Sequence, residues 1–194
     1  MLEINVRSNH FSQKCTSRCG RDNLIFEIEM RAFHSILRFL PKPRLALEMG
    51  SVGLVRALDS RGIGIERNLP KLTRARKVPA IFTLCQAPSP ALFLKECHHL
   101  LRPEGRIFIG FIPRESPWGR FYMETHKGRR PTHRWGQLYS LKKMEHIMMA
   151  AGFSIQGYFS TLFQKPGAVK EPEKPLRGYR PQAGFLVIVG ERRD

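Results

Sequence analysis

Apolar residues occur along the chain in two patterns, one typical of helices and one typical of buried strands. From position 24 to position 40 the apolar residues lie three and four apart, which predicts one face of a helix. The residues on this face are Phe26, Met30, Phe33, Leu37 and Leu40. Asp22 is suited to cap the start of the helix, and Pro41 and Pro43 predict its end.

Beyond this helix, short apolar runs alternate with helical stretches. The apolar runs predict strands at 44–48, 62–66, 80–85, 106–112, 153–159 and 184–190. The stretches between them predict helices at 54–60, 69–77, 90–101 and 140–151, and a turn at 102–105. The alternation predicts an α/β fold, a Rossmann-like three-layer sandwich whose mostly parallel sheet is covered by helices on both faces. The last helix, strand, loop and strand predict an antiparallel C-terminal strand pair.

Composition divides the chain into a short polar start and one domain. Residues 1–21 are polar and are expected to be poorly ordered, whereas 22–194 are expected to form a single domain. An insertion or lid is predicted at 113–139, where Arg, Gly, Pro and aromatic residues gather. No apolar run approaches the roughly 20 residues that cross a bilayer, and residues 1–20 do not resemble a secretory signal. Because cysteines are sparse as well, a cytoplasmic location is expected.

The charge balance is strongly basic. Lysine and arginine total 33 against 16 acidic residues, which gives a formal net charge of +17. Such a charge attracts polyanions, so nucleic acid is a candidate partner, but a generally solubilising surface would have the same composition. Since like-charged copies repel each other, the protein is expected to be a monomer in dilute buffer.

Chemistry is first suggested by glycines that follow the strand predicted at 44–48. Gly50 and Gly53 would let the backbone approach a nucleoside cofactor closely, and the helix that follows would point its N-terminus at the cofactor's polar end. Glu66 ends the next predicted strand, where a carboxylate can accept hydrogen bonds from both ribose hydroxyls. A tight strand-to-helix turn beside a solvated glutamate remains the other interpretation.

A more specific signal comes from the second half of the chain. A helix at 90–101, the turn Arg-Pro-Glu-Gly at 102–105 and the apolar strand at 106–112 follow one another directly. An amphipathic helix then ends in Ala-Ala-Gly-Phe at 150–153. This order resembles class I S-adenosylmethionine-dependent methyltransferases. The resemblance covers roughly residues 45–189, which is most of the chain.

The resemblance implies S-adenosyl-L-methionine as the cofactor and methyl transfer to an unidentified acceptor, expected to be a small molecule, as the activity. The residues that it implies for the cofactor are Glu48, Gly50, Ser51, Gly53, Glu66 and Cys85. Glu48 would begin the acidic glycine-rich motif, Glu66 would bind the ribose, and Cys85 would lie along the cofactor cleft. Because the sulfonium is already activated, positioning supplies most of the rate acceleration, and no catalytic base is predicted.

The chain departs from the family pattern in two places. The glycine loop at 48–53 has two glycines and is one residue short. Between Glu66 and Ala80 there is room for one helix and little else, so the sheet is expected to lack one edge strand and the site one wall of its adenine pocket. These departures keep a second function open, that of a non-catalytic methyltransferase-like module that binds a partner such as RNA.

Other candidate sites are weaker. His10, Cys15 and Cys19 fit no strong zinc spacing, and no metal site is predicted. His98 and His99 are adjacent on one predicted helix, so they cannot both face one site. The aromatic and basic residues at 118–130 suit a lid over the cleft, or less favourably a surface that stacks bases.

Overall fold

The computed structural model describes the second half of the chain almost continuously, over residues 89–125 and 137–193. It also describes the strand segments 45–47, 64–66 and 75–81, and helical residues 24, 25, 27–32 and 35. The predicted polar start at 1–21 and the helix expected at 54–60 lie outside these residues.

A single seven-stranded sheet organises the molecule, in the order β2-β1-β3-β4-β7-β5-β6. Its strands are β1 (Leu45–Leu47), β2 (Gly64–Glu66), β3 (Ala75–Ile81), β4 (Leu101–Phe111), β5 (Phe153–Thr161), β6 (Leu176–Arg177) and β7 (Phe185–Arg192). The pairs β1–β2, β1–β3 and β3–β4 are parallel. The pairs β4–β7, β5–β7 and β5–β6 are antiparallel. Because β7 runs against both neighbours, β4 and β5 run in the same direction.

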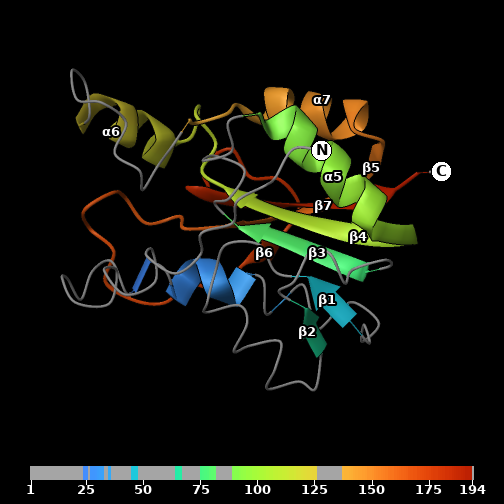
Figure 1. Ribbon diagram of the computed structural model, residues 1–194. Helices are drawn as coiled ribbons and strands as arrows, with labels where there is room; N and C mark the ends of the chain where they lie inside the picture. Colours follow the sequence, from blue (N-terminus) through green and yellow to red (C-terminus); the bar gives the residue numbers. More distant parts are fainter. Residues whose placement is uncertain are drawn as a thin grey trace.

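Helices cover both faces of this sheet, as the sequence predicts. Helices α5 (Pro90–Leu100) and α7 (Leu141–Ala150) lie together on one face, and the helix within residues 24–35 lies on the other (Figure 1). A further helix, α6 (Pro117–Thr125), stands beyond the end of β4. The three-layer α/β architecture is therefore confirmed.

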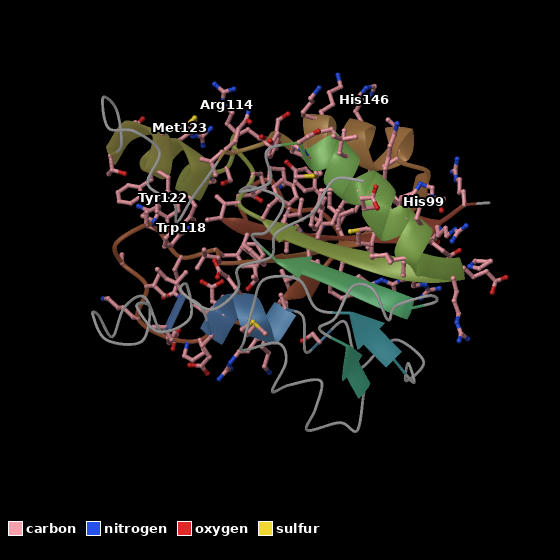
Figure 2. The ribbon with its side chains drawn as sticks, in the orientation of Figure 1. His99, Arg114, Trp118, Tyr122, Met123 and His146 are labelled. Atoms are coloured by element: carbon pink, nitrogen blue, oxygen red, sulfur yellow. The ribbon has the colours of Figure 1, made fainter. Side chains whose placement is uncertain are left out.

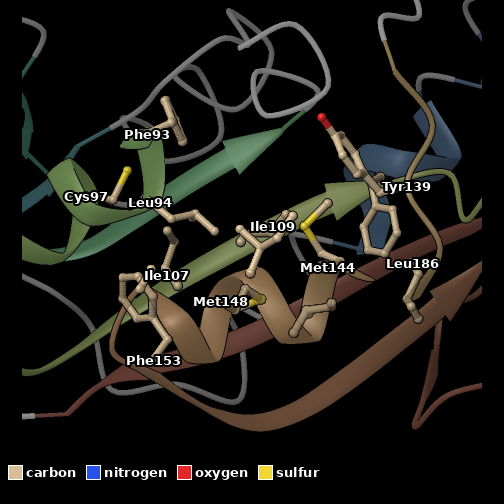
Figure 3. Packing of buried hydrophobic residues seen from close by; sticks show 14 of the residues in the cluster. Phe93, Leu94, Cys97, Ile107, Ile109, Tyr139, Met144, Met148, Phe153 and Leu186 are labelled. Atoms are coloured by element: carbon tan, nitrogen blue, oxygen red, sulfur yellow. The ribbon is translucent and has the colours of Figure 1, made fainter. Parts of the chain in front are cut away.

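The central strands are buried on both faces because each face contributes to a separate core. Alternate residues of β4 point to opposite sides: Ile107 and Ile109 pack against α5 and α7, whereas Phe108 packs on the opposite face. Figure 3 shows the first core, in which Leu94 and Met148 from the two helices meet Ile109. The near-continuous apolar runs of β4 and β7 follow from this two-sided burial.

A bulge in β5 changes which face its side chains reach. The pairing with β7 shifts between Ile155 and Gly157, so Gln156 is the extra residue. Ile155 and Tyr158 consequently pack on the same face although they are three positions apart, and Phe159 turns to the opposite core.

The start of β3 corrects two sequence predictions. The helix predicted at 69–77 is wrong in its last part, because residues 75–77 are strand, and the strand predicted at 80–85 begins five residues earlier. Pro79 obscured this strand, since proline cannot donate to a sheet ladder. Pro79 is tolerated because, within the described residues, the pairing of β1 with β3 is at Lys77, before the proline.

The turn predicted at 102–105 is present as an irregularity at the start of β4. Leu101 pairs with Ala75, and the next pairing joins Arg106 to Lys77. The residues between them loop out, and Glu104 adopts a φ of 60° there.

The helices α5 and α7 form where the sequence predicts them. Ser89 and Ser140 cap them, since their Oγ atoms accept hydrogen bonds from the backbone N–H groups of Leu92 and Lys143. Gly152 ends α7 with a φ of +94°, and a side chain there would approach His98 to 2.7 Å. Leu92 lies outside the buried face of α5, because it is 53% exposed.

Three other expectations have mixed outcomes. In the helix within 24–35, Met30 is buried as predicted. Ile28 and Ala32, which do not belong to the predicted face, are buried as well. The other four residues of the predicted face lie outside the described side chains. Within the described residues no strand lies beyond β2, so the loss of an edge strand stays a prediction. None of the described helices is long and apolar enough to cross a membrane.

The central core generates a stability prediction. Ile109→Ala removes a fully buried side chain that contacts both helices, and it should lower the free energy of unfolding by about 2–5 kcal/mol. Leu92→Ala truncates an exposed side chain and should change it by less than about 0.5 kcal/mol. Urea unfolding followed by circular dichroism measures both; equal effects would contradict the assignment of Ile109 to the core.

Candidate functional site

The carboxyl ends of the parallel strands define the edge where the predicted cofactor residues gather. Leu47, the last residue of β1, pairs with Glu66, the last residue of β2. The backbone of Glu66 therefore lies beside the residue that precedes Glu48. Glu48, Gly50, Ser51, Gly53 and Cys85 themselves lie outside the described residues, and their roles stay predictions.

The same edge carries two further segments from the second half of the chain. Since β4 and β5 run in the same direction, the segments that follow them leave the sheet on one side. After β4 comes α6, and after β5 comes a long loop at 162–184 that leads to β7 through β6. Thr161, the last residue of β5, pairs with Phe185, and Phe111, the last residue of β4, pairs with Leu186. The two segments therefore leave the sheet on either side of the start of β7.

Local contacts fix the start of α6. Ser116 is buried and caps the helix, because its Oγ accepts a 2.9 Å hydrogen bond from the N–H of Gly119. A Cβ on Gly119 would overlap the carbonyl oxygen of Pro113, so the chain can turn this tightly only with glycine. The pair Ser116-Pro117 is a helix-start signal that sequence analysis missed in this Arg- and Gly-rich stretch.

Trp118 anchors α6 to the body of the protein. Its ring is 2% exposed and packs in the core with Phe159 and Phe185, and its Nε1 donates a 2.8 Å hydrogen bond to the carbonyl oxygen of Gln164. Gly184 leaves the space for the indole, since a Cβ there would overlap the ring. Figure 2 shows Trp118 and Tyr122 on the side of α6 nearer the sheet. Trp118 is thus not available to stack on a base.

The loop at 162–184 is held by one carboxylate. Glu173 accepts hydrogen bonds from the N–H groups of Phe163 and Gln164, at 2.6 and 2.8 Å. The side chain of Gln164 also bonds to Glu173 and accepts from the N–H of Lys170. At the start of the loop Leu162 has a φ of 64°, a conformation unusual for a branched side chain.

The far end of this loop is fastened to β5. Ser160 is fully buried, and its Oγ donates to the carbonyl oxygen of Gly178 and accepts from the N–H of Arg180. The N–H of Gly178 donates to the carbonyl oxygen of Tyr158. Both ends of the loop are therefore fixed relative to α6 and the sheet.

Two tyrosines and two glutamates gather where α7 meets β5. Tyr158 donates a 2.6 Å hydrogen bond to Glu145 of α7, and its ring centroid lies 6.4 Å from that of Tyr179. Desolvation, and after it the hydrogen bond and the charge of Glu145, raise the pKa of Tyr158 well above its usual range. Desolvation and the charges of Glu115 and Glu145 also raise the pKa of Tyr179. Both phenols thus stay neutral at physiological pH, and that of Tyr158 donates to Glu145.

Cysteine and histidine chemistry is not favoured in the described part of the chain. Burial, and after it the charge of Glu96, raise the pKa of the Cys97 thiol to about 12, so the thiolate nucleophile is not formed near neutral pH. His98 lies 2.9 Å from the carbonyl oxygen of Arg193 through its Nε2, whereas His99 is exposed. No group of three metal-binding side chains occurs among the residues described.

Comparison with known proteins gives sequence relatives that have no described function. No family model matches the chain. An uncharacterized protein of Mycobacterium tuberculosis is 29% identical over 84% of this chain. The chain spans 65% of the length of that relative, just under two thirds. An uncharacterized protein of Methanocaldococcus jannaschii is 22% identical over 88% of this chain and 91% of its own length.

Several solved structures similar to this chain are methyltransferases. A SAM-dependent methyltransferase of Thermotoga maritima superposes with a TM-score of 0.68 at 23% identity, over 88% of this chain and 90% of its own. Magnesium protoporphyrin IX methyltransferase of Synechocystis, with bound S-adenosylhomocysteine, gives a TM-score of 0.55 at 12% identity. The match covers 91% of this chain and 89% of that protein. The chain therefore has the fold of the class I S-adenosylmethionine-dependent methyltransferases, as the sequence resemblance implies.

The contact between Gly184 and Trp118 generates a second prediction. Gly184→Ala should displace the indole and lower the free energy of unfolding by about 1–3 kcal/mol. Gly157→Ala is the matched control, because no atom lies within 4 Å of its added Cβ, and it should change stability by less than about 0.5 kcal/mol. Denaturant unfolding measures stability, and limited proteolysis reports whether α6 has loosened. A Gly184→Ala protein as stable and as protease-resistant as the control would show that the indole is not held tightly.

The pKa of Tyr158 generates a third prediction. Because the folded state holds its proton more tightly than the unfolded state, this group's stabilisation is complete below the unfolded pKa of about 10 and is lost as the pH rises above it. The free energy of unfolding should therefore fall between about pH 10 and pH 12, and less steeply in Tyr158→Phe. Urea unfolding across this range gives the two slopes. Equal slopes would rule out a raised pKa at Tyr158.

Proposed function

We propose that the protein transfers the methyl group of S-adenosyl-L-methionine to a small-molecule acceptor. The observation that supports this most directly is the register of β1 and β2, which brings the backbone of Glu66 beside Leu47 at the edge where the glycine loop begins. The similarity in fold to methyltransferases, among them one with bound S-adenosylhomocysteine, supports the same proposal.

The types of residue expected at this edge suit the cofactor. Glu66 ends a parallel strand, and a carboxylate in that position suits both hydroxyls of the ribose. Gly50 and Gly53 follow β1 directly and allow close approach of the backbone, with Ser51 between them and Glu48 at the start of the loop. Cys85 follows β3, whose carboxyl end faces the same edge.

The chemistry asks little of the protein's side chains. When bound, the cofactor supplies a methyl group on a sulfonium, which needs no further activation. The protein's part is to bind and orient both reactants and to keep water out. We assign the last task to α6 and the rest of the segment at 113–139, since α6 is anchored by Trp118 at the same edge of the sheet.

A second candidate function follows from the connection between β2 and β3. Only residues 67–74 join these strands, fewer than the dozen or more residues that a helical crossover between parallel strands usually needs. From this length we expect no further strand carrying an adenine-binding acid in the segment. This observation favours a methyltransferase-like protein that binds a partner without catalysis.

Calorimetric titration with S-adenosylhomocysteine separates the two candidates. The methyltransferase proposal expects saturable binding, and Glu66→Ala should weaken it by about 1–3 kcal/mol because the ribose hydroxyls lose a charged partner. Glu104→Ala, which removes an exposed glutamate at the opposite edge, should bind as tightly as the wild type. No heat and no thermal shift with millimolar cofactor would leave the non-catalytic function as the better account.

A further inference from the structure

Five basic side chains lie close together in sequence on the loop that follows β5. They are Lys165, Lys170, Lys174, Arg177 and Arg180, and we call residues 165–180 the basic loop. All five are exposed, and within the described part of the chain none of them forms an ion pair. Their charges therefore act outward into solvent.

The acidic residues of the basic loop do little to balance these charges. Glu173 is turned inward, where its carboxylate accepts from the N–H groups of Phe163 and Gln164. Glu171 is the other acid of the loop, and it is exposed. Two further acids, Glu115 and Glu145, lie near Tyr179 at the C-terminal end of the loop. The loop as a whole therefore keeps a formal excess of positive charge, with five basic residues against two acidic ones.

The basic loop is also held in place before any partner arrives. Val169 is buried in the core, Gln164 fixes the backbone of Lys170, and Ser160 fixes that of Arg180. A loop that is already ordered gives up less conformational entropy on binding than a mobile one does.

The apolar residues of the described surface argue against a membrane or a protein as the partner. Its large exposed apolar residues are Leu92, Phe121, Met149 and Leu176, and they lie on four different elements. Membrane insertion needs a continuous apolar face, and stable protein interfaces are generally centred on apolar or aromatic anchors. A phosphodiester backbone needs only cations and hydrogen-bond donors.

We propose that the basic loop is a docking surface for the phosphate backbone of a nucleic-acid strand. In Figure 1 the loop runs along the left of the molecule, on the same side as α6. Three strand spacings, or about 14 Å along the sheet edge, separate β5 from β3, and four, or about 19 Å, separate it from β1, so a strand bound to the loop need not occupy the proposed cofactor site. The inference thus goes beyond methyl transfer and does not require cofactor binding.

Fluorescence anisotropy with a labelled single-stranded RNA tests the proposal, using the full chain over a series of salt concentrations. Binding by the wild type should weaken as salt rises, because each neutralised phosphate releases counterions. The slope of log K against log salt is negative, and the triple variant K165Q/K170Q/K174Q should make it shallower by about 2. Each lysine that pairs with a phosphate contributes about 0.7 to its magnitude. The variant K165R/K170R/K174R keeps the charge and should retain the wild-type slope.

A charge-matched control separates a defined surface from a diffuse field. K95Q/R102Q/R193Q also removes three exposed charges, which lie on α5 and at the opposite edge of the sheet, and it should leave the slope unchanged. Equal reductions of the slope in the two glutamine variants would overturn the proposal, as would a wild type that binds no RNA at low salt or that binds anionic lipid vesicles instead. Titration with S-adenosylhomocysteine is a separate measurement, so failure here would not affect the methyl-transfer proposal.

Discussion

The position of β7, inserted antiparallel between β4 and β5, is the constraint on which the rest of the described structure depends. Its pairing with β4 runs from Phe111 to Arg106, and its pairing with β5 spans the whole of that strand. Because β7 opposes both neighbours, β4 and β5 must run in the same direction and end at the same edge. The burial of β7 on both faces, with Val187 in one core and Ile188 in the other, stabilises this order.

From this arrangement it follows that α6 and the loop at 162–184 meet. Trp118 fills the space that Gly184 leaves at the start of β7 and donates to the backbone of Gln164, while Glu173 closes the loop from within. One buried indole and one inward carboxylate thus turn two segments rich in proline, glycine and charge into fixed structure. The same contacts leave the lysines of the loop facing solvent, which separates its structural side from its charged side.

The proposed cofactor site is distributed differently, over the first half of the sheet. There the strands are short, and β1 pairs with β3 at a single position. The short connection from β2 to β3 reduces the protein available to enclose an adenine ring. Methyl transfer from a sulfonium tolerates a less enclosed site better than reactions that require a positioned acid and base, because orientation supplies most of the rate acceleration.

The sequence by itself determined the elements whose signals are local. The helical stretches at 90–101 and 140–151 predict α5 and α7, and continuous apolar runs predict β4 and β7, because burial on one stripe or on two faces leaves a pattern in the residues themselves. Resemblance to a known family added the fold and the proposed roles of Glu48 and Glu66.

Only the tertiary structure decided the features that depend on distant partners. Pro79 lies within β3, where the described pairing with β1 is at Lys77, and α6 depends on an anchor 46 positions away at Gln164. The bulge at Gln156 turns the end of β5 to the other core, and this shift depends on the register with β7. Contacts between residues far apart in the chain are set by packing, which no local pattern of apolar and polar residues encodes.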